Sequence, residues 1–149
     1  MEEKTKKVLN RLEGQCSKRE YCSTDVYAKA LKGLEGDAEA AREVLESLLA
    51  DGFVSDLRYA TAFAREKSSL TGWGPIKIRY ALLAKKIDPA TIDEALSETD
   101  DDKARQKLER LIEAKRKTLE GDPQMKLKLI RFALSRGYDY DKIKDLISK

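Results

Sequence analysis

The arrangement of this chain is decided by residues 78–96, which read IRYALLAKKIDPATIDEAL. Two apolar residues four positions apart precede an aspartate, and two more follow it: Ile78, Leu82, Asp88, Ile92 and Leu96. Asp88 is of a residue type that caps helix N-termini, and Pro89 stands at the first helical position, where its missing N–H costs nothing. The stretch therefore predicts two short helices joined by a tight turn.

The same pattern recurs about 51 residues away in both directions. Toward the C-terminus the equivalent residues are Leu129, Ala133, Asp139, Ile143 and Ile147. Toward the N-terminus they are Tyr27, Leu31, Asp37, Ala41 and Leu45. In each copy an apolar helix ends, an aspartate caps the next helix, and two apolar residues follow. The repeat predicts three modules of three helices each, with boundaries 1–52, 53–99 and 100–149.

Signals for helices are dense along the rest of the chain, and strand-type alternation is missing. Further helix starts are expected at a capping box formed by Ser17 and Glu20, at Ser55 or Asp56, and at Pro75, Asp100 and Asp122. We expect an all-α fold, a tandem array of three three-helix, helix-turn-helix-like modules that is elongated and curved. Its radius of gyration should exceed the roughly 15 Å of a compact chain of this length.

Composition excludes several classes of function. The chain has no histidine, so Ser-His-Asp and Cys-His catalysis and histidine-ligated zinc are excluded. Neither a phosphate-binding loop nor an apolar run of about 18 residues is present. The paired acids at 93–94 and 100–102 fit helix starts better than a catalytic pair. Cys16 and Cys22 could pair, but two reduced, partly buried thiols are the simpler expectation. We expect a cytoplasmic protein that is no enzyme and has no cofactor or metal.

Charge is unevenly distributed, although the net charge is only +3. Residues 65–86 contain six basic side chains and one acid, and residues 126–136 contain four basic side chains and no acid. Such clusters can contact phosphates or an acidic protein groove, but they also occur on ordinary solvated helices. Trp73, between two glycines, is either a plug between modules or an anchor for a partner. The candidate partner-binding residues are Arg58, Arg65, Lys67, Trp73, Lys77, Arg79, Lys126, Lys128, Arg131 and Arg136.

Several stretches resemble the RecX family. Its central signature is matched by residues 53–63 (FVSDLRYATAF), residues 72–78 (GWGPIKI) and Leu82. The family's opening is similar to residues 16–22 and 29–31, and its closing repeat to residues 131–138. One position departs from the family pattern, because Lys86 stands where a glycine is usual. A left-handed helix end there would cost a non-glycine residue roughly 1 kcal/mol.

The resemblance implies a regulator of the RecA recombinase, with a role in DNA repair by homologous recombination and in the SOS response. Members of the family consist of tandem three-helix modules, lie along the groove of the RecA filament on DNA, and usually inhibit its ATP hydrolysis and strand exchange. No catalytic residue or cofactor comes with the family. The expected partners are the RecA filament and, weakly and electrostatically, single- or double-stranded DNA, with the protein acting as a monomer.

Two other interpretations remain open at this point. Three-helix modules resemble helix-turn-helix units, so the chain could bind DNA without specificity for RecA. It could also be a helical scaffold without a role on nucleic acid. ATP hydrolysis by RecA on single-stranded DNA, measured with and without this protein, separates RecA regulation from DNA binding alone. Reversal of Lys77 and Arg79 to glutamate tests the basic patch, because a contact surface would lose RecA inhibition while its fold stays intact.

Overall fold

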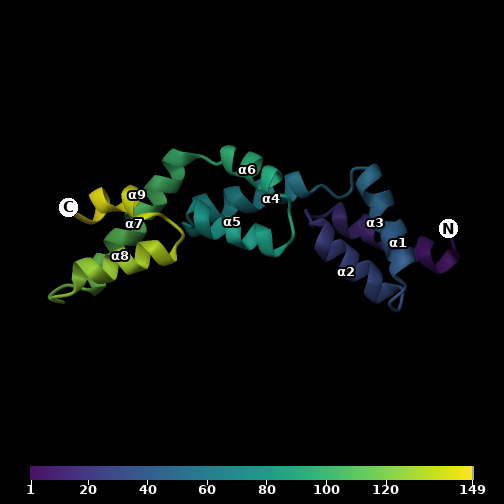
Figure 1. The fold of residues 1–149 in the computed structure, drawn as a ribbon, viewed down its shortest axis with the longest axis horizontal. Coiled ribbons are helices and arrows are strands. Elements are labelled where there is room, and N and C mark those ends of the chain that lie inside the picture. The colour runs from purple at the N-terminus through teal and green to yellow at the C-terminus, as the bar shows by residue number, and fades with distance from the viewer. Residues whose placement is uncertain (149) are drawn as a thin grey trace.

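The computed structural model describes residues 1–148, which form nine α-helices, one short π-helical turn and no strand. The helices are α1 (Glu3–Cys16), α2 (Ser23–Gly33), α3 (Ala38–Ala50), α4 (Asp56–Glu66), α5 (Pro75–Ala84), α6 (Pro89–Ser97), α7 (Asp101–Thr118), α8 (Met125–Ser135) and α9 (Tyr140–Ser148), with the π-helical turn η1 at Lys67–Thr71. They follow one another in groups of three along an elongated, bent body with the two termini at opposite ends (Figure 1). The expected all-α array of three-helix units is confirmed.

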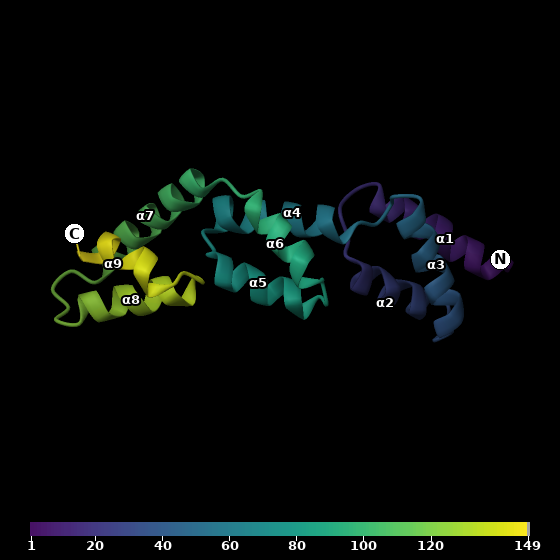
Figure 2. The same ribbon diagram turned by 45° about the horizontal axis from the view of Figure 1, so that its top comes forward.

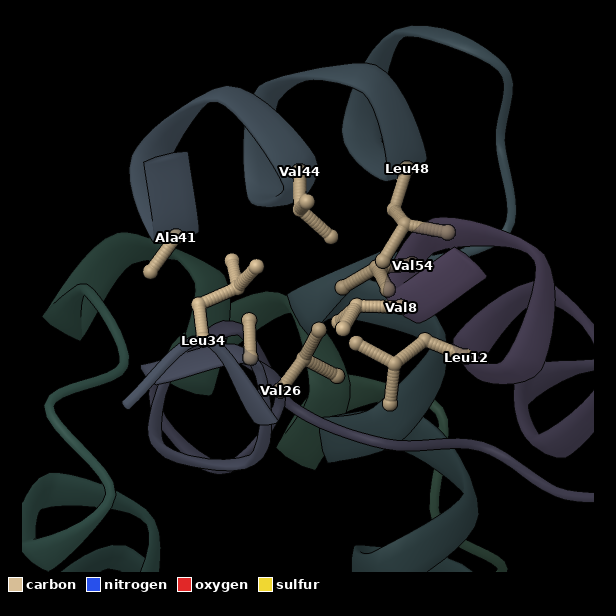
Figure 3. Packing of buried hydrophobic residues seen from close by; sticks show 9 residues of the cluster. Val8, Leu12, Val26, Leu34, Ala41, Val44, Leu48 and Val54 are labelled. Carbon is tan, nitrogen blue, oxygen red and sulfur yellow. The ribbon is translucent and has the colours of Figure 1, made fainter. Parts of the chain in front are cut away.

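Each group of three helices encloses its own hydrophobic core. The first core lies between α1, α2 and α3 (Figure 3) and contains Val8, Leu12, Val26, Leu34, Ala41, Val44, Leu48 and Val54. The second contains Ala60, Ala64, Ile78, Leu82, Ile87, Ile92 and Ala95, and the third Leu108, Ile112, Leu129, Ala133, Tyr138, Ile143 and Ile147. Cys22, which precedes α2, is fully buried in the second core. Domain boundaries at 52 and 99 stay a prediction.

The 51-residue repeat is visible in the backbone of the turn between the second and third helix of each group. Glu35, Lys86 and Gly137 occupy equivalent positions and have φ angles of 56°, 60° and 96°. All three are left-handed, a conformation that favours glycine. The aspartates that follow also agree with the repeat: Asp37 and Asp139 accept hydrogen bonds from the backbone N–H three residues on. Asp88 makes no such bond, and Pro89 begins α6 there.

Three local predictions are wrong. Ser17 ends α1 instead of capping the second helix, and α2 begins at Ser23. Helix α8 begins at Met125, because Asp122 caps a preceding turn by accepting from the Gln124 N–H. In the first group the buried face of α2 lies one residue earlier than the repeat predicts: Val26 and Ala30 are buried, and Tyr27 and Leu31 only partly so. Elsewhere Ser55 and Asp100 cap as expected, and Pro75 opens α5.

Candidate interface on the second helices

Helices α8 and α5 meet end to end. The Gly74 N–H donates to the Arg136 carbonyl oxygen over 2.6 Å, and the Ile76 N–H donates to the Gly137 carbonyl oxygen over 3.0 Å. The first N–H groups and last C=O groups of any helix lack partners within that helix. Here the carbonyl end of α8 satisfies the amide end of α5, and their dipoles are aligned head to tail.

Two glycines make this close approach possible. A Cβ atom on Gly74 would lie 2.3 Å from the Gly137 carbonyl oxygen, and one on Gly137 would lie 2.4 Å from Lys77 Cβ. Gly137 also has a left-handed φ of +96°. A side chain at either position would therefore separate α8 from α5.

The other end of α5 meets the start of α2. The Thr24 hydroxyl donates to the Lys85 carbonyl oxygen at 2.7 Å, and the Lys85 ammonium pairs with Asp25 at 3.1 Å. The Asp56 carboxylate, at the start of α4, accepts from the Ser23 N–H at 2.8 Å and so caps α2 from the neighbouring group. Helix α5 is therefore tied at both ends to helices of other groups.

These junctions place α8, α5 and α2 in succession along one long side of the molecule (Figures 1 and 2). At 1.5 Å of rise per residue, the three helices amount to roughly 50 Å of helix. We call this row the second-helix line. It is defined by residues 125–135, 75–84 and 23–33.

The second-helix line is basic. Helices α5 and α8 contain no acidic residue, and the one acid of α2, Asp25, is paired with Lys85. The basic residues of the three helices are Lys29, Lys32, Lys77, Arg79, Lys126, Lys128 and Arg131. Five of the ten candidate binding residues, all those on α5 and α8, therefore lie on this line. Lys29 and Lys32 were missed, because the first module is acidic as a whole.

Ion pairs neutralise part of this charge. Arg79 pairs with Asp93 of α6, and Lys128 pairs with Asp122. Lys126 and Arg131 are exposed and have no ion-pair partner within residues 1–148. Residues 65–86 have five more basic than acidic side chains, but the local net charge is smaller than this count. The fold brings acids from other segments to Arg79, Lys85 and Arg65.

Trp73 lies at the start of α5, between two lysines. The ammonium nitrogens of Lys67 and Lys77 are 4.9 and 4.5 Å from the centre of the indole ring. The Phe63 ring packs edge-on at 6.0 Å. Trp73 is partly buried against the second core and lines a cleft of about 540 Å³, whose other wall includes Leu108 and Leu146. These two cation–π contacts place two positive charges beside the indole.

The remaining candidates make contacts within the chain. Arg136 donates to the Thr71 carbonyl oxygen at 3.2 Å. Arg58 pairs with Glu20 at 3.2 Å and donates to the Gly52 carbonyl oxygen at 2.7 Å, so it ties the first group to α4. Arg65, also on α4, lies 3.8 Å from Glu98. The structure therefore does not bring Arg58 and Arg65 onto the second-helix line.

Burial and a hydrogen bond shift the pKa of groups at the junction between the first and second helix groups. Desolvation raises the pKa of the Cys22 thiol and of the Tyr59 phenol. The hydrogen bond to Asp25 raises the pKa of Lys85. Within residues 1–148 we find no cluster of acidic or cysteine side chains arranged to hold a metal ion, and no helix long and apolar enough to cross a membrane.

Comparison with known proteins agrees with the three-helix fold. The family model for the second three-helix domain of RecX matches residues 55–96. Regulatory protein RecX of Clostridium botulinum is 36% identical over 123 residues, which cover 80% of this chain and 56% of that protein. Regulatory protein RecX of Bacillus mycoides is 35% identical over 103 residues, covering 68% and 38%. The chain thus spans about half or less of the length of these relatives.

Two solved structures share the fold. A crystal structure of RecX from Lactobacillus salivarius superposes with a TM-score of 0.83 at 22% identity, over 97% of this chain and 95% of that one. A second crystal structure, of regulatory protein RecX, gives a TM-score of 0.86 at 20% identity, over 98% of this chain and 72% of that one.

Proposed function

The chain belongs to the RecX family, and from that premise we propose that it is a regulatory binding protein of the RecA filament on DNA. In this proposal it inhibits RecA's ATP hydrolysis and strand exchange. It acts in the cytoplasm as a monomer, without a cofactor or a reaction of its own. The observation that carries the proposal is the second-helix line, a row of helices in which α5 and α8 present cations and no acid.

The length of the line suits a partner with an extended surface. Roughly 50 Å of helix exceeds the diameter of a small domain, which is about 30 Å. A row of that length contacts neighbouring parts of a repeating surface better than a single pocket. Exposed cations such as Lys126 and Arg131 favour a partner that carries phosphates or carboxylates.

ATP hydrolysis by RecA on single-stranded DNA, measured with increasing amounts of this protein, tests the proposal. We expect hydrolysis to fall as the protein approaches the stoichiometry of the filament. Lys126→Glu combined with Arg131→Glu should inhibit much less, because both side chains are exposed and unpaired within residues 1–148. Unchanged hydrolysis at stoichiometric wild-type protein contradicts the proposal.

A second candidate function is DNA binding without specificity for RecA, which the same cations support. Binding to bare DNA should then be tight at physiological salt and should inhibit any DNA-dependent ATPase equally. Under the first proposal, affinity for bare DNA is weak and falls steeply with salt, because it reflects counterion release alone. Fluorescence anisotropy with labelled DNA at several salt concentrations separates the two functions.

A further inference from the structure

Helices α5 and α8 carry large apolar side chains on the side that faces away from their cores. On α5, Ile76, Tyr80 and Leu83 are 45%, 72% and 42% exposed. On α8, Leu127 and Leu134 are 42% and 44% exposed. The spacing of i, i+4 and i+7 places each set on one helical face. We call these two sets the apolar stripes.

The two stripes are copies of each other under the 51-residue repeat. Ile76 corresponds to Leu127 and Leu83 to Leu134. Between them, Tyr80 corresponds to Arg131, which is also exposed. In α2 the equivalent positions are Asp25, Lys29 and Lys32. The stripes therefore belong to the second and third helix groups and not to every copy of the repeat.

The fold does not need these side chains. Helix α5 already buries Ile78 and Leu82 in the second core, and α8 buries Leu129 and Ala133 in the third. A surface helix in water normally carries polar residues opposite its buried face. Contiguous exposed apolar residues mark interaction surfaces, and tyrosine and arginine are frequent energetic centres of such interfaces.

The chemistry of the stripes favours a protein partner over a nucleic acid. Isoleucine and leucine side chains gain little against phosphates but are stabilised against apolar side chains. Around them, α5 and α8 provide cations without any acid. The complementary surface is therefore apolar at its centre and carries aspartate or glutamate at its rim.

We propose that the apolar stripes of α5 and α8 form a two-site docking face for an acidic protein surface, which is a surface of the RecA filament if the proposed function holds. The Gly74–Arg136 junction fixes the position of one stripe relative to the other. Two linked sites bind a partner that repeats its surface far more tightly than one site does. The second-helix line then binds the partner protein through its apolar residues, and its cations add electrostatic attraction at longer range.

The test compares Tyr80→Ser/Leu83→Ser and Leu127→Ser/Leu134→Ser with Leu49→Ser. Leu49 lies on α3, outside the line, and is 42% exposed, like Leu83. Each protein is titrated against RecA filaments on single-stranded DNA and against the same DNA alone, by anisotropy and by ATP hydrolysis. Circular dichroism of each variant checks the fold.

We expect each double variant to need roughly tenfold or more protein for half-saturation of the filament, while its binding to bare DNA is unchanged. Leu49→Ser should behave like the wild type. Filament binding that the stripe variants leave intact overturns the docking face alone. Wild-type binding without inhibition overturns the proposed inhibition but leaves the docking face supported if the stripe variants weaken that binding. No wild-type binding to the filament overturns both.

Discussion

The Gly74 N–H donates to the carbonyl oxygen of Arg136 across 2.6 Å, and this bond joins the second and third helix groups end to end. The two residues are far apart in the sequence, yet the start of α5 uses the end of α8 as its cap. The Arg136 side chain returns to the Thr71 carbonyl oxygen at 3.2 Å and reinforces the junction. The junction converts separate three-helix units into one line.

Gly74→Ala should weaken this junction. Its Cβ would lie 2.3 Å from the Gly137 carbonyl oxygen, so α5 and α8 must separate. We expect a loss of about 1–3 kcal/mol in the free energy of unfolding, measured with urea. Small-angle scattering should show a change in the radius of gyration.

The matched control is Gly14→Ala within α1, where nothing lies within 4 Å of the new Cβ. It should gain about 0.5–1 kcal/mol. Equal stability of Gly74→Ala and wild type contradicts the role of the junction.

Lys86→Gly should stabilise the protein. Lys86 has a φ of +60°, so its backbone is in the left-handed conformation. Glycine adopts this conformation without the steric cost that a side chain imposes. We expect a gain of about 0.5–1 kcal/mol in urea unfolding. Lys86→Ala, which removes the charge but keeps the backbone strain, should show no such gain. If alanine stabilises as much as glycine, charge and not backbone strain is responsible.

Stability should fall at alkaline pH. The pKa of Cys22, Tyr59 and Lys85 is raised in the folded protein, as it also is for Cys16 and Tyr138. The folded state therefore holds these protons more tightly than the unfolded state. Their contribution is complete below the unfolded pKa, about 9.0 for the thiols, and is lost as pH rises through the folded values.

The urea midpoint measured from pH 7 upward should begin to decline near pH 9. Cys22→Ala should make the first part of the decline shallower, because the thiol with the raised pKa is gone. Asp25→Asn should reduce the later part, because the hydrogen bond to Asp25 is the main cause of the raised pKa of Lys85. A midpoint that stays level to pH 11 contradicts this account.

The sequence predicted the helices best where one residue type decides the backbone. Pro75, Pro89 and Asp37 each mark a helix start because ring geometry or a side-chain acceptor acts locally. The helix start predicted at Ser17 was wrong for the opposite reason. The cap of α2 is the carboxylate of Asp56, which lies 33 residues beyond Ser23. Local patterns do not reveal a cap that another part of the fold supplies.

The candidate interface was predictable only in part. Basic residues of α5 and α8 were found because each helix lacks acids in sequence. Their ion pairs were not, because Asp93 approaches Arg79 only through the packing of α6 on α5. The apolar stripes were also missed, because the sequence alone does not distinguish a buried apolar residue such as Ile78 from an exposed one such as Tyr80. The repeat contained the signal, as both stripes recur at the same spacing.

Footprinting of lysines on the filament-bound protein tests the central claim most directly. The protein is acetylated under limiting conditions, alone and on RecA filaments with single-stranded DNA, and modification is read by mass spectrometry. The account predicts that Lys126 on α8 and Lys86, which lies in the turn two residues beyond the end of α5, become protected. Exposed lysines off the line, Lys7 on α1 and Lys103 on α7, should react as in the free protein. Protection of Lys7 and Lys103 with Lys126 and Lys86 left reactive would contradict the assignment of the second-helix line as the binding face.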